Sequence, residues 1–153
     1  MPRVQRSADV TWEGNVARGS GTVSASSGAF SELGFSLPSR IGEVAGKTSP
    51  EELLAAAHAG CYAMSLAGEL AQAGTPPERL VVTATVTLDE VEGGSHRIVG
   101  SELHARTAAD GVDAAALERA AHAADEGCPF SALIKASGTV TVNAELEGGT
   151  DGD

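Results

Sequence analysis

The sequence is poor in aromatic residues and in positive charge. Only 3% of its 153 residues are aromatic, so a core has to be built from Ala, Val and Leu, whose small side chains let backbones approach closely. Ten Lys and Arg residues stand against 21 Asp and Glu, which gives a net charge of −11. That charge opposes binding to phosphate backbones and to anionic lipid surfaces. We therefore expect no nucleic-acid partner and no membrane partner.

Long apolar runs and cysteines are scarce as well. The longest uncharged apolar segment, residues 53–68, contains His58 and is dominated by Ala and Gly, which predicts a buried helix rather than a membrane span. The opening residues, MPRVQRSAD, lack the apolar run of a secretory signal, so we expect a cytoplasmic protein. Cys61 and Cys128 are too few for a secreted disulfide scaffold. Such a pair in a reducing compartment indicates a working thiol site.

Short segments rich in Val, Thr and Ser and separated by glycine predict two groups of strands. The first group is a meander of three strands, expected at residues 3–12, 14–24 and 30–37. The second group is a hairpin expected at residues 80–88 and 96–107. A final strand is expected at residues 138–146. Residues 39–48 lack periodicity and are expected to form a loop that carries Arg40. The length fits a single domain over residues 1–147. The polar tail at residues 148–153 is expected to be flexible.

The clearest predicted element is a long helix. Ser49 is placed at the N-cap, Pro50 at the first helical position and Glu52 at the third, which is a capping box. The helix is expected to end just before Gly74. It carries no charge between Glu52 and Glu69. A helix that is apolar on every face has to be covered on every face, so we infer a partner subunit.

A second helix is expected over residues 113–126, with Gly127 directly after its end. Cys128 and Pro129 then begin a short helical turn that runs to Lys135, since Pro favours the first helical position. A cysteine at the N-cap faces the positive end of its helix, which favours the thiolate. The alternative is that Cys128 is only a small buried hydrophobe.

Cys61 lies in the middle of the long apolar helix, where a thiol is inert unless a cation approaches it. Arg40 is the nearest candidate, because a guanidinium stays charged and can hold both a thiolate and an oxygen-bearing substrate. A solvated loop arginine is the alternative for Arg40, and Arg18 is a rival for the activating role. Glu51 is ten helical positions from Cys61, about 15 Å. A shared site must therefore take Glu51 from a second chain or use it to orient an arginine.

His58 is three residues before Cys61 and shares its helical face, a spacing that can chelate a metal ion. The sequence offers one further cysteine and no carboxylate cluster, so we expect no metal site. A buried histidine bonded to a backbone carbonyl is expected instead.

Four segments form a specific pattern: WEG at residues 12–14, Arg40 in a loop, SPEELLAAAHAGC at residues 49–61 and EGCPFSALIKA at residues 126–136. Together they resemble the OsmC/Ohr family of osmotically inducible proteins and organic hydroperoxide reductases. The resemblance covers residues 10–146, and WEG with the short loop is nearer to the OsmC branch. It implies an α+β fold in which antiparallel sheets wrap around long central helices in an intertwined homodimer, with two active sites at the subunit interface.

The resemblance also implies a role for each site residue. Cys61 is the peroxidatic cysteine, Cys128 the resolving cysteine, Arg40 the activator of thiolate and peroxide, and Glu51 the carboxylate partner of Arg40. In the implied cycle, Cys61 becomes a sulfenic acid and then forms a disulfide with Cys128. An external dithiol resets the pair, and similar proteins use lipoyl-type dithiols. No metal or organic cofactor is required.

The implied function is an antioxidant, stress-response peroxidase that reduces organic hydroperoxides, with hydrogen peroxide as a further candidate substrate. Leu53, Leu54 and Phe130 are candidates for a pocket that favours alkyl over inorganic peroxides. Helix capping favours Cys128 as the reactive thiol, whereas the resemblance assigns the attack to Cys61. Two other functions stay open: a redox-sensing or small-molecule-binding dimer without turnover, and a structural dimer with inert core cysteines.

Overall fold

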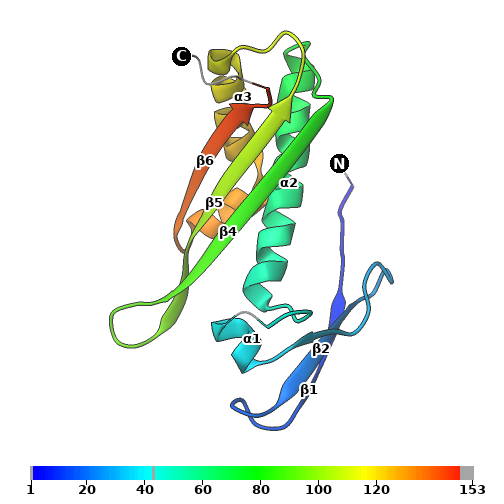
Figure 1. Cartoon of the computed structure of the whole chain (residues 1–153), viewed down its shortest axis with the longest axis vertical. Helices are drawn as coiled ribbons and strands as arrows, with labels where there is room; N and C mark the ends of the chain where they lie inside the picture. Colours follow the sequence, from blue (N-terminus) through cyan, green and yellow to red (C-terminus); the bar gives the residue numbers. More distant parts are fainter. Residues whose placement is uncertain (1, 43, 149–153) are drawn as a thin grey trace. The chain divides into compact units, whose positions relative to one another are not determined.

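The structure is a computed structural model that describes residues 2–42 and 44–148. It divides into two compact units, Met1–Leu53 and Leu54–Asp153. Of the tail expected to be flexible, residues 149–153 lie outside the described residues. Each unit contains one three-stranded sheet, so the mixed α+β class expected from the sequence is confirmed (Figure 1).

The sheet of the first unit is an antiparallel meander, as predicted. Its strands are β1 (Ala8–Glu13), β2 (Ser20–Ala25) and β3 (Leu33–Phe35), in the order β1-β2-β3. Gly21 on the central strand pairs with Trp12 on one side and Phe35 on the other. The two aromatic rings lie 5.6 Å apart. A Cβ atom at Gly21 would approach both rings within 2.8 Å, so glycine is required there.

The predicted loop over residues 39–48 is wrong in its first part, because α1 (Leu37–Ile41) is a short helix that carries Arg40. Reciprocal capping explains it. The Ser39 N–H donates to Ser36 Oγ at 3.3 Å, and the Ser36 N–H donates to Ser39 Oγ at 2.8 Å. Five residues are too few to show an apolar period, so the caps were the only signal.

The long helix α2 (Pro50–Gln72) begins and ends close to the predicted positions. The Glu52 N–H donates to Ser49 Oγ at 3.1 Å, which is one half of the expected capping box. The Glu52 carboxylate instead accepts a hydrogen bond from the Thr48 hydroxyl at 2.9 Å. Gly74, with φ of 82°, follows the end of the helix in the left-handed conformation.

The described residues of the second unit bury one face of α2. Its buried residues follow the four-residue spacing of one helical face: His58, Tyr62, Leu66 and Leu70. The opposite face carries small side chains and one methionine, which are exposed: Ala56, Gly60, Met64 and Gly68. Met64 has 78% of its surface exposed.

The sheet of the second unit is mixed rather than wholly antiparallel. The predicted hairpin is formed by β4 (Arg79–Glu90) and β5 (His96–Ala108), which are antiparallel. The last strand, β6 (Thr139–Leu146), runs parallel to β5. A parallel neighbour needs a crossover, which α3 (Ala114–Gly127) and α4 (Pro129–Lys135) supply. The expectation of antiparallel sheets is therefore wrong for β6.

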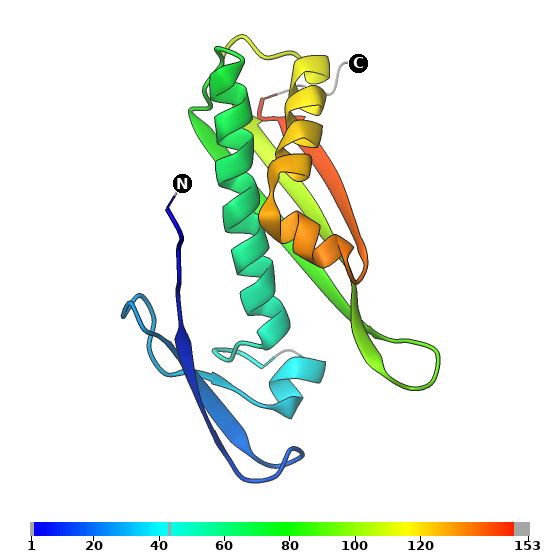
Figure 2. The same cartoon turned by 180° about the vertical axis from the view of Figure 1, so that it is seen from behind.

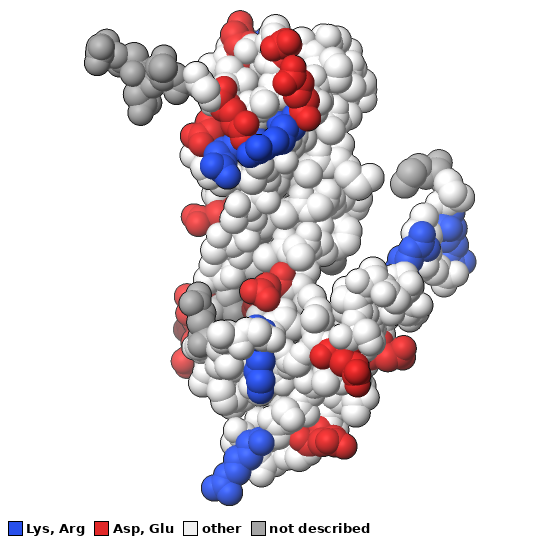
Figure 3. Space-filling view, turned by 45° about the vertical axis from the view of Figure 1, so that its right-hand side comes forward, with Lys and Arg blue, Asp and Glu red and all other residues white. Residues whose placement is uncertain are grey.

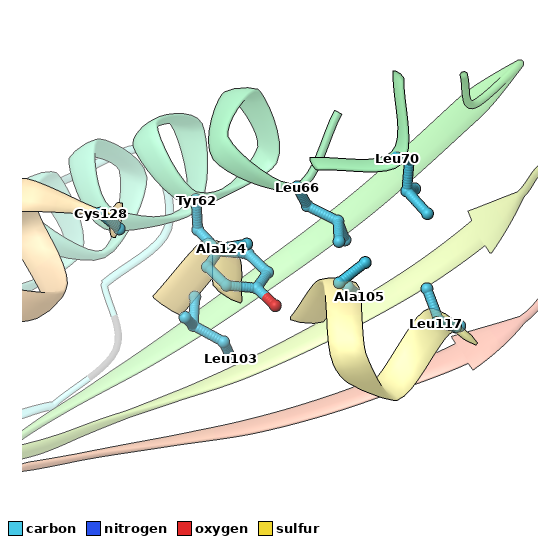
Figure 4. Packing of buried hydrophobic residues seen from close by; sticks show 9 residues of the cluster. Tyr62, Leu66, Leu70, Leu103, Ala105, Leu117, Ala124 and Cys128 are labelled. Atoms are coloured by element: carbon cyan, nitrogen blue, oxygen red, sulfur yellow. The ribbon is translucent and has the colours of Figure 1, made fainter. Parts of the chain in front are cut away.

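The helices of the second unit lie on one face of this sheet. Figure 2 shows α2 and α3 side by side across that face. The core lies between them and the sheet, where Tyr62, Leu66 and Leu70 project from α2 toward β5 and α3 (Figure 4). The Tyr62 hydroxyl donates to the Ala121 carbonyl of α3 at 3.1 Å.

Gly127 is the last residue of α3 and does not follow its end as predicted. Cys128, with φ of −85° and ψ of 113°, turns the chain out of the helix, so no left-handed glycine is needed. The predicted short helix after Cys128 is confirmed as α4.

The molecular surface mixes charges of both signs. On the face drawn in Figure 3, acidic and basic side chains lie among broad uncharged areas. Among the described residues, no helix is both long and apolar enough to cross a membrane.

Candidate active site

The two cysteines are neighbours in the second unit. Cys61 lies in the middle of α2, and Cys128 lies at the N-cap of α4. Both are free thiols, and they lie close enough for Cys128 to raise the pKa of the Cys61 thiol. Cys128 is buried in the core cluster, and Cys61 packs against that cluster. The fold thus pairs two residues that are far apart in the sequence.

The N-terminal end of α4 was expected to act on Cys128, but it acts on Cys61. The side chain of Cys128 makes no capping hydrogen bond. The backbone of Phe130, in the first turn of α4, instead lowers the pKa of the Cys61 thiol. The predicted place of Cys128 at the N-cap of α4 is confirmed, but the backbone at the start of this helix affects the pKa of Cys61.

The surroundings of Cys61 raise the pKa of its thiol above the ordinary value. Burial is the largest cause, and the neighbouring side chain of Cys128 raises the pKa further. The Phe130 amide lowers it in part. These groups alone therefore keep Cys61 in the thiol form at neutral pH, so thiolate chemistry at Cys61 needs a cation in addition.

A fixed cation is present in the first unit. Arg40, at the end of α1, donates to Glu51 Oε1 from Nε at 2.9 Å and from Nη2 at 2.7 Å. The Arg40 side chain is 43% exposed, whereas that of Glu51 is 14% exposed. The rival Arg18 lies exposed in the turn between β1 and β2, where its backbone N–H donates to Asn15 Oδ1 at 2.9 Å. Glu51 therefore orients one of the two candidate cations.

Arg40 lies on the wall of an apolar pocket. The pocket has a volume of about 320 Å³ and is lined by Trp12, Val16, Phe35, Ser36, Leu37, Arg40 and Pro50. Leu53, Leu54 and Phe130, which the sequence offered as pocket residues, do not line this pocket. Phe130 packs against the core cluster of the second unit. Gly21 brings Trp12 and Phe35 together because it pairs with both. The sequence does not give this strand register, so the pocket could not be predicted from it.

His58 is fully buried one helical turn before Cys61. Its Nδ1 lies 2.7 Å from Ser101 Oγ and its Nε2 lies 2.9 Å from Ser131 Oγ. The predicted bond to a backbone carbonyl is therefore wrong, because two serine hydroxyls satisfy the ring. Burial lowers the pKa of His58, which keeps the ring neutral. Within the part of the chain that the structure describes, no three His, Cys, Asp or Glu side chains form a group that could hold a metal ion.

The chain is similar to known proteins over most of its length. A family model described as "OsmC-like protein" matches residues 43–143. The chain is 36% identical over 144 residues to Peroxiredoxin OsmC of Escherichia coli, and the match covers 94% of this chain and 98% of that protein.

Solved structures share the fold. The organic hydroperoxide resistance protein OhrB of Bacillus subtilis matches with 27% identity and a TM-score of 0.67, covering 92% of this chain and 98% of that one. An organic hydroperoxide resistance protein OsmC from Legionella pneumophila matches with 24% identity and a TM-score of 0.70, covering 94% and 98%.

Proposed function

The chain belongs to the OsmC-like protein family, and on that premise we propose that it is a thiol-dependent peroxidase that reduces organic hydroperoxides through Cys61 and Cys128. Its relatives are named for peroxide reduction and for organic hydroperoxide resistance. The observation that carries the proposal is that two free thiols are neighbours, with Cys128 in the core cluster and Cys61 packed against it. Two adjacent thiols allow one to be oxidised and the other to resolve it.

The proposed cycle begins with the Cys61 thiolate. Its sulfur attacks a peroxide oxygen, the O–O bond breaks, and the alkoxide takes up a proton and leaves as the alcohol. Cys61 is then a sulfenic acid. Cys128 attacks its sulfur, the S–S bond forms and the S–O bond breaks, and water leaves. An external dithiol of the lipoyl type reduces the disulfide and is itself oxidised.

We assign activation of Cys61 to Arg40. Burial and the neighbouring thiol raise the pKa of Cys61, so a positive charge is needed to favour the thiolate. Arg40 is always charged, and two hydrogen bonds to Glu51 fix the plane of its guanidinium. Glu51 acts through Arg40 in this scheme and is its positioning residue.

The apolar pocket supports an organic substrate. Trp12, Phe35 and Leu37 offer surface to an alkyl group, and Arg40 on the same wall offers donors to a peroxide oxygen. Hydrogen peroxide has no group that would use the apolar lining. The pocket therefore favours alkyl hydroperoxides.

The active protein is proposed to be a homodimer in which residues 1–147 act as one OsmC-like domain. The support is the exposed face of α2, where small residues and Met64 would otherwise contact water. A cycle that depends on a thiol reductant suits the reducing cytoplasm, which is the location expected from the sequence.

Turnover with a dithiol tests the function. The reduced protein is mixed with excess cumene hydroperoxide and dihydrolipoamide, and peroxide consumption is followed over time. Many equivalents of peroxide consumed per protein, with no consumption by Cys61→Ser, is the expected result. Oxidation that stops after one equivalent would contradict the proposal and favour a redox sensor without turnover.

A further inference from the structure

His58 is a buried residue that the proposed peroxidase cycle does not use. Each of its ring nitrogens lies within 3 Å of a serine hydroxyl, at 2.7 Å for Ser101 and 2.9 Å for Ser131. Both serines are themselves buried. A buried polar network whose members are satisfied holds them in one arrangement. The imidazole therefore forms a joint between α2, β5 and α4.

The hydrogen-bonded group of His58, Ser101 and Ser131 lies close to Cys61 along α2 and to Cys128 along α4. Ser131 comes three residues after Cys128 in α4, and His58 comes three residues before Cys61 in α2. Three residues are about one helical turn. The contact between His58 and Ser131 thus holds α4 against α2 about one helical turn away from the two cysteines.

The contact between His58 and Ser131 does not involve the reacting sulfur, whereas the interactions of Cys61 with α4 do. Cys61 interacts with α4 through the side chain of Cys128 and the backbone of Phe130, both of which shift its pKa. Both involve the sulfur whose charge and bonding change when peroxide oxidises it. The hydrogen bond between His58 and Ser131 contains no sulfur, so it persists while Cys61 is a sulfenic acid.

We propose that His58 is a positioning residue for Cys128: by holding Ser131, it keeps α4 against α2 after Cys61 has been oxidised and so speeds disulfide formation. The inference rests on the proposed function. In the step concerned, the Cys128 sulfur loses its proton and attacks the Cys61 sulfur. The S–S bond forms, the S–O bond breaks, and hydroxide takes up a proton and leaves as water.

The size of the effect follows from the geometry of attack. Held reactants gain large effective concentrations, and a misplacement of about 1 Å costs on the order of a hundredfold in rate. Partial release of α4, which Lys135 and Asp125 still anchor by an ion pair of 2.6 Å, is expected to cost about tenfold. Peroxide attack does not require the Cys128 sulfur to approach, and release of α4 weakens the opposite effects of Phe130 and Cys128 on the Cys61 pKa together, so the rate of attack is expected to change less than that of disulfide formation.

Two matched serine variants test this proposal. Ser131→Ala and Ser101→Ala each remove one hydroxyl from the same imidazole, but only Ser131→Ala detaches α4. Each reduced protein is mixed with one equivalent of cumene hydroperoxide. Dimedone trapping measures the sulfenic acid at Cys61, and quenching with mass spectrometry measures the disulfide.

We expect Ser131→Ala to form the disulfide about tenfold more slowly than the unsubstituted protein, and Ser101→Ala to stay within about twofold of it. In both variants the rate of sulfenic acid formation should change less than the rate of disulfide formation changes in Ser131→Ala. Equal slowing in the two variants would reduce His58 to a general structural role and overturn the proposal, as would no slowing in either.

Two substitutions of His58 give an independent answer if Ser131→Ala does not fold. The Gln amide reaches about as far as Nε2 and can keep the contact with Ser131, whereas the Asn amide corresponds to Nδ1 and can keep only Ser101. His58→Gln is expected to retain more of the disulfide-forming rate than His58→Asn. The reverse order, or equal rates, would contradict the proposal.

A second oxidant separates this inference from the proposed function. Diamide needs no peroxide: it adds to the Cys61 sulfur, and Cys128 then displaces the hydrazine product as the disulfide forms. If cumene hydroperoxide leaves the unsubstituted protein unoxidised, the proposed function fails. The order of the variants with diamide then decides the role of His58 by itself.

Discussion

Arg40 donates two hydrogen bonds to a single oxygen of Glu51, and the other oxygen of that carboxylate, Oε2, is buried without a partner. A buried acceptor without a partner is costly, and the two bonds to Arg40 leave that cost in place because both end on Oε1. The guanidinium is thereby fixed in one plane. This arrangement suits a positioning role for Glu51.

Glu51→Gln is predicted to slow peroxide reduction about tenfold, because the neutral amide no longer fixes the Arg40 guanidinium by charge-assisted hydrogen bonds. The pair is partly exposed, so the free energy of unfolding should change by less than about 1 kcal/mol. Stopped-flow oxidation and urea unfolding measure the two effects. Glu52→Gln, which makes the same change one residue on, is the control. Equal rates in the two variants would exclude a special role for Glu51.

The reactivity of Cys61 is predicted to depend on pH through Arg40. Burial and Cys128 raise the pKa of Cys61, and removal of the proposed cation leaves that effect without compensation. Arg40→Met should therefore move the pH profile of Cys61 alkylation by iodoacetamide to higher pH, while Arg40→Lys should move it less. Mass spectrometry of the Cys61 peptide gives the profile. An unmoved profile in Arg40→Met would assign the activation elsewhere, with Arg18→Met as the next variant to measure.

His58 is predicted to make stability depend on pH. Folding lowers its pKa through burial, which outweighs the raising effect of Asp125 and acts together with Lys135. The unfolded chain therefore binds more protons below about pH 6.5, so the free energy of unfolding should fall as the pH drops from there toward the lowered pKa. Urea unfolding at pH 7.5 and 5.5 should show a smaller loss in His58→Gln. The exposed His122→Gln is the control, and a loss unchanged by His58→Gln would contradict the assignment.

Gly21→Ala is predicted to disturb the apolar pocket. The new methyl group would meet the rings of Phe35 and Trp12 within 2.8 Å, which is expected to cost about 1–3 kcal/mol. Because both rings line the pocket, the preference for cumene hydroperoxide over hydrogen peroxide should also fall. Gly34→Ala on the neighbouring strand, where the nearest atom is 3.9 Å away, is the control. An unchanged preference in Gly21→Ala would mean that the substrate does not use this pocket.

The starts of two helices could be predicted from the sequence, because the residues that cause them lie next to one another in the chain. The start of α2 follows from Ser49 and Pro50, and the start of α4 from Pro129, because caps act within a few residues. The direction of β6 could not be predicted, since alternation of side chains is the same in parallel and antiparallel strands. The short α1 was missed because its caps are two serines without an apolar period.

The site was only partly predictable from the sequence. The two cysteines and Arg40 are candidates that residue types and the resemblance of their segments bring forward. The Phe130 amide on Cys61 and the serine partners of His58 were not found. Ser131 is 73 residues from His58. Contacts over such separations depend on how the helices pack, and no local pattern reports them.

Single turnover in three proteins tests the central claim most directly. The reduced unsubstituted protein, Cys61→Ser and Cys128→Ser are each mixed with one equivalent of cumene hydroperoxide, and the sulfur oxidation states are read by mass spectrometry. The account predicts a disulfide between Cys61 and Cys128 in the unsubstituted protein, a lasting sulfenic acid at Cys61 in Cys128→Ser, and no oxidation in Cys61→Ser. A sulfenic acid at Cys128 in Cys61→Ser, or no oxidation of either thiol in the unsubstituted protein, would contradict it.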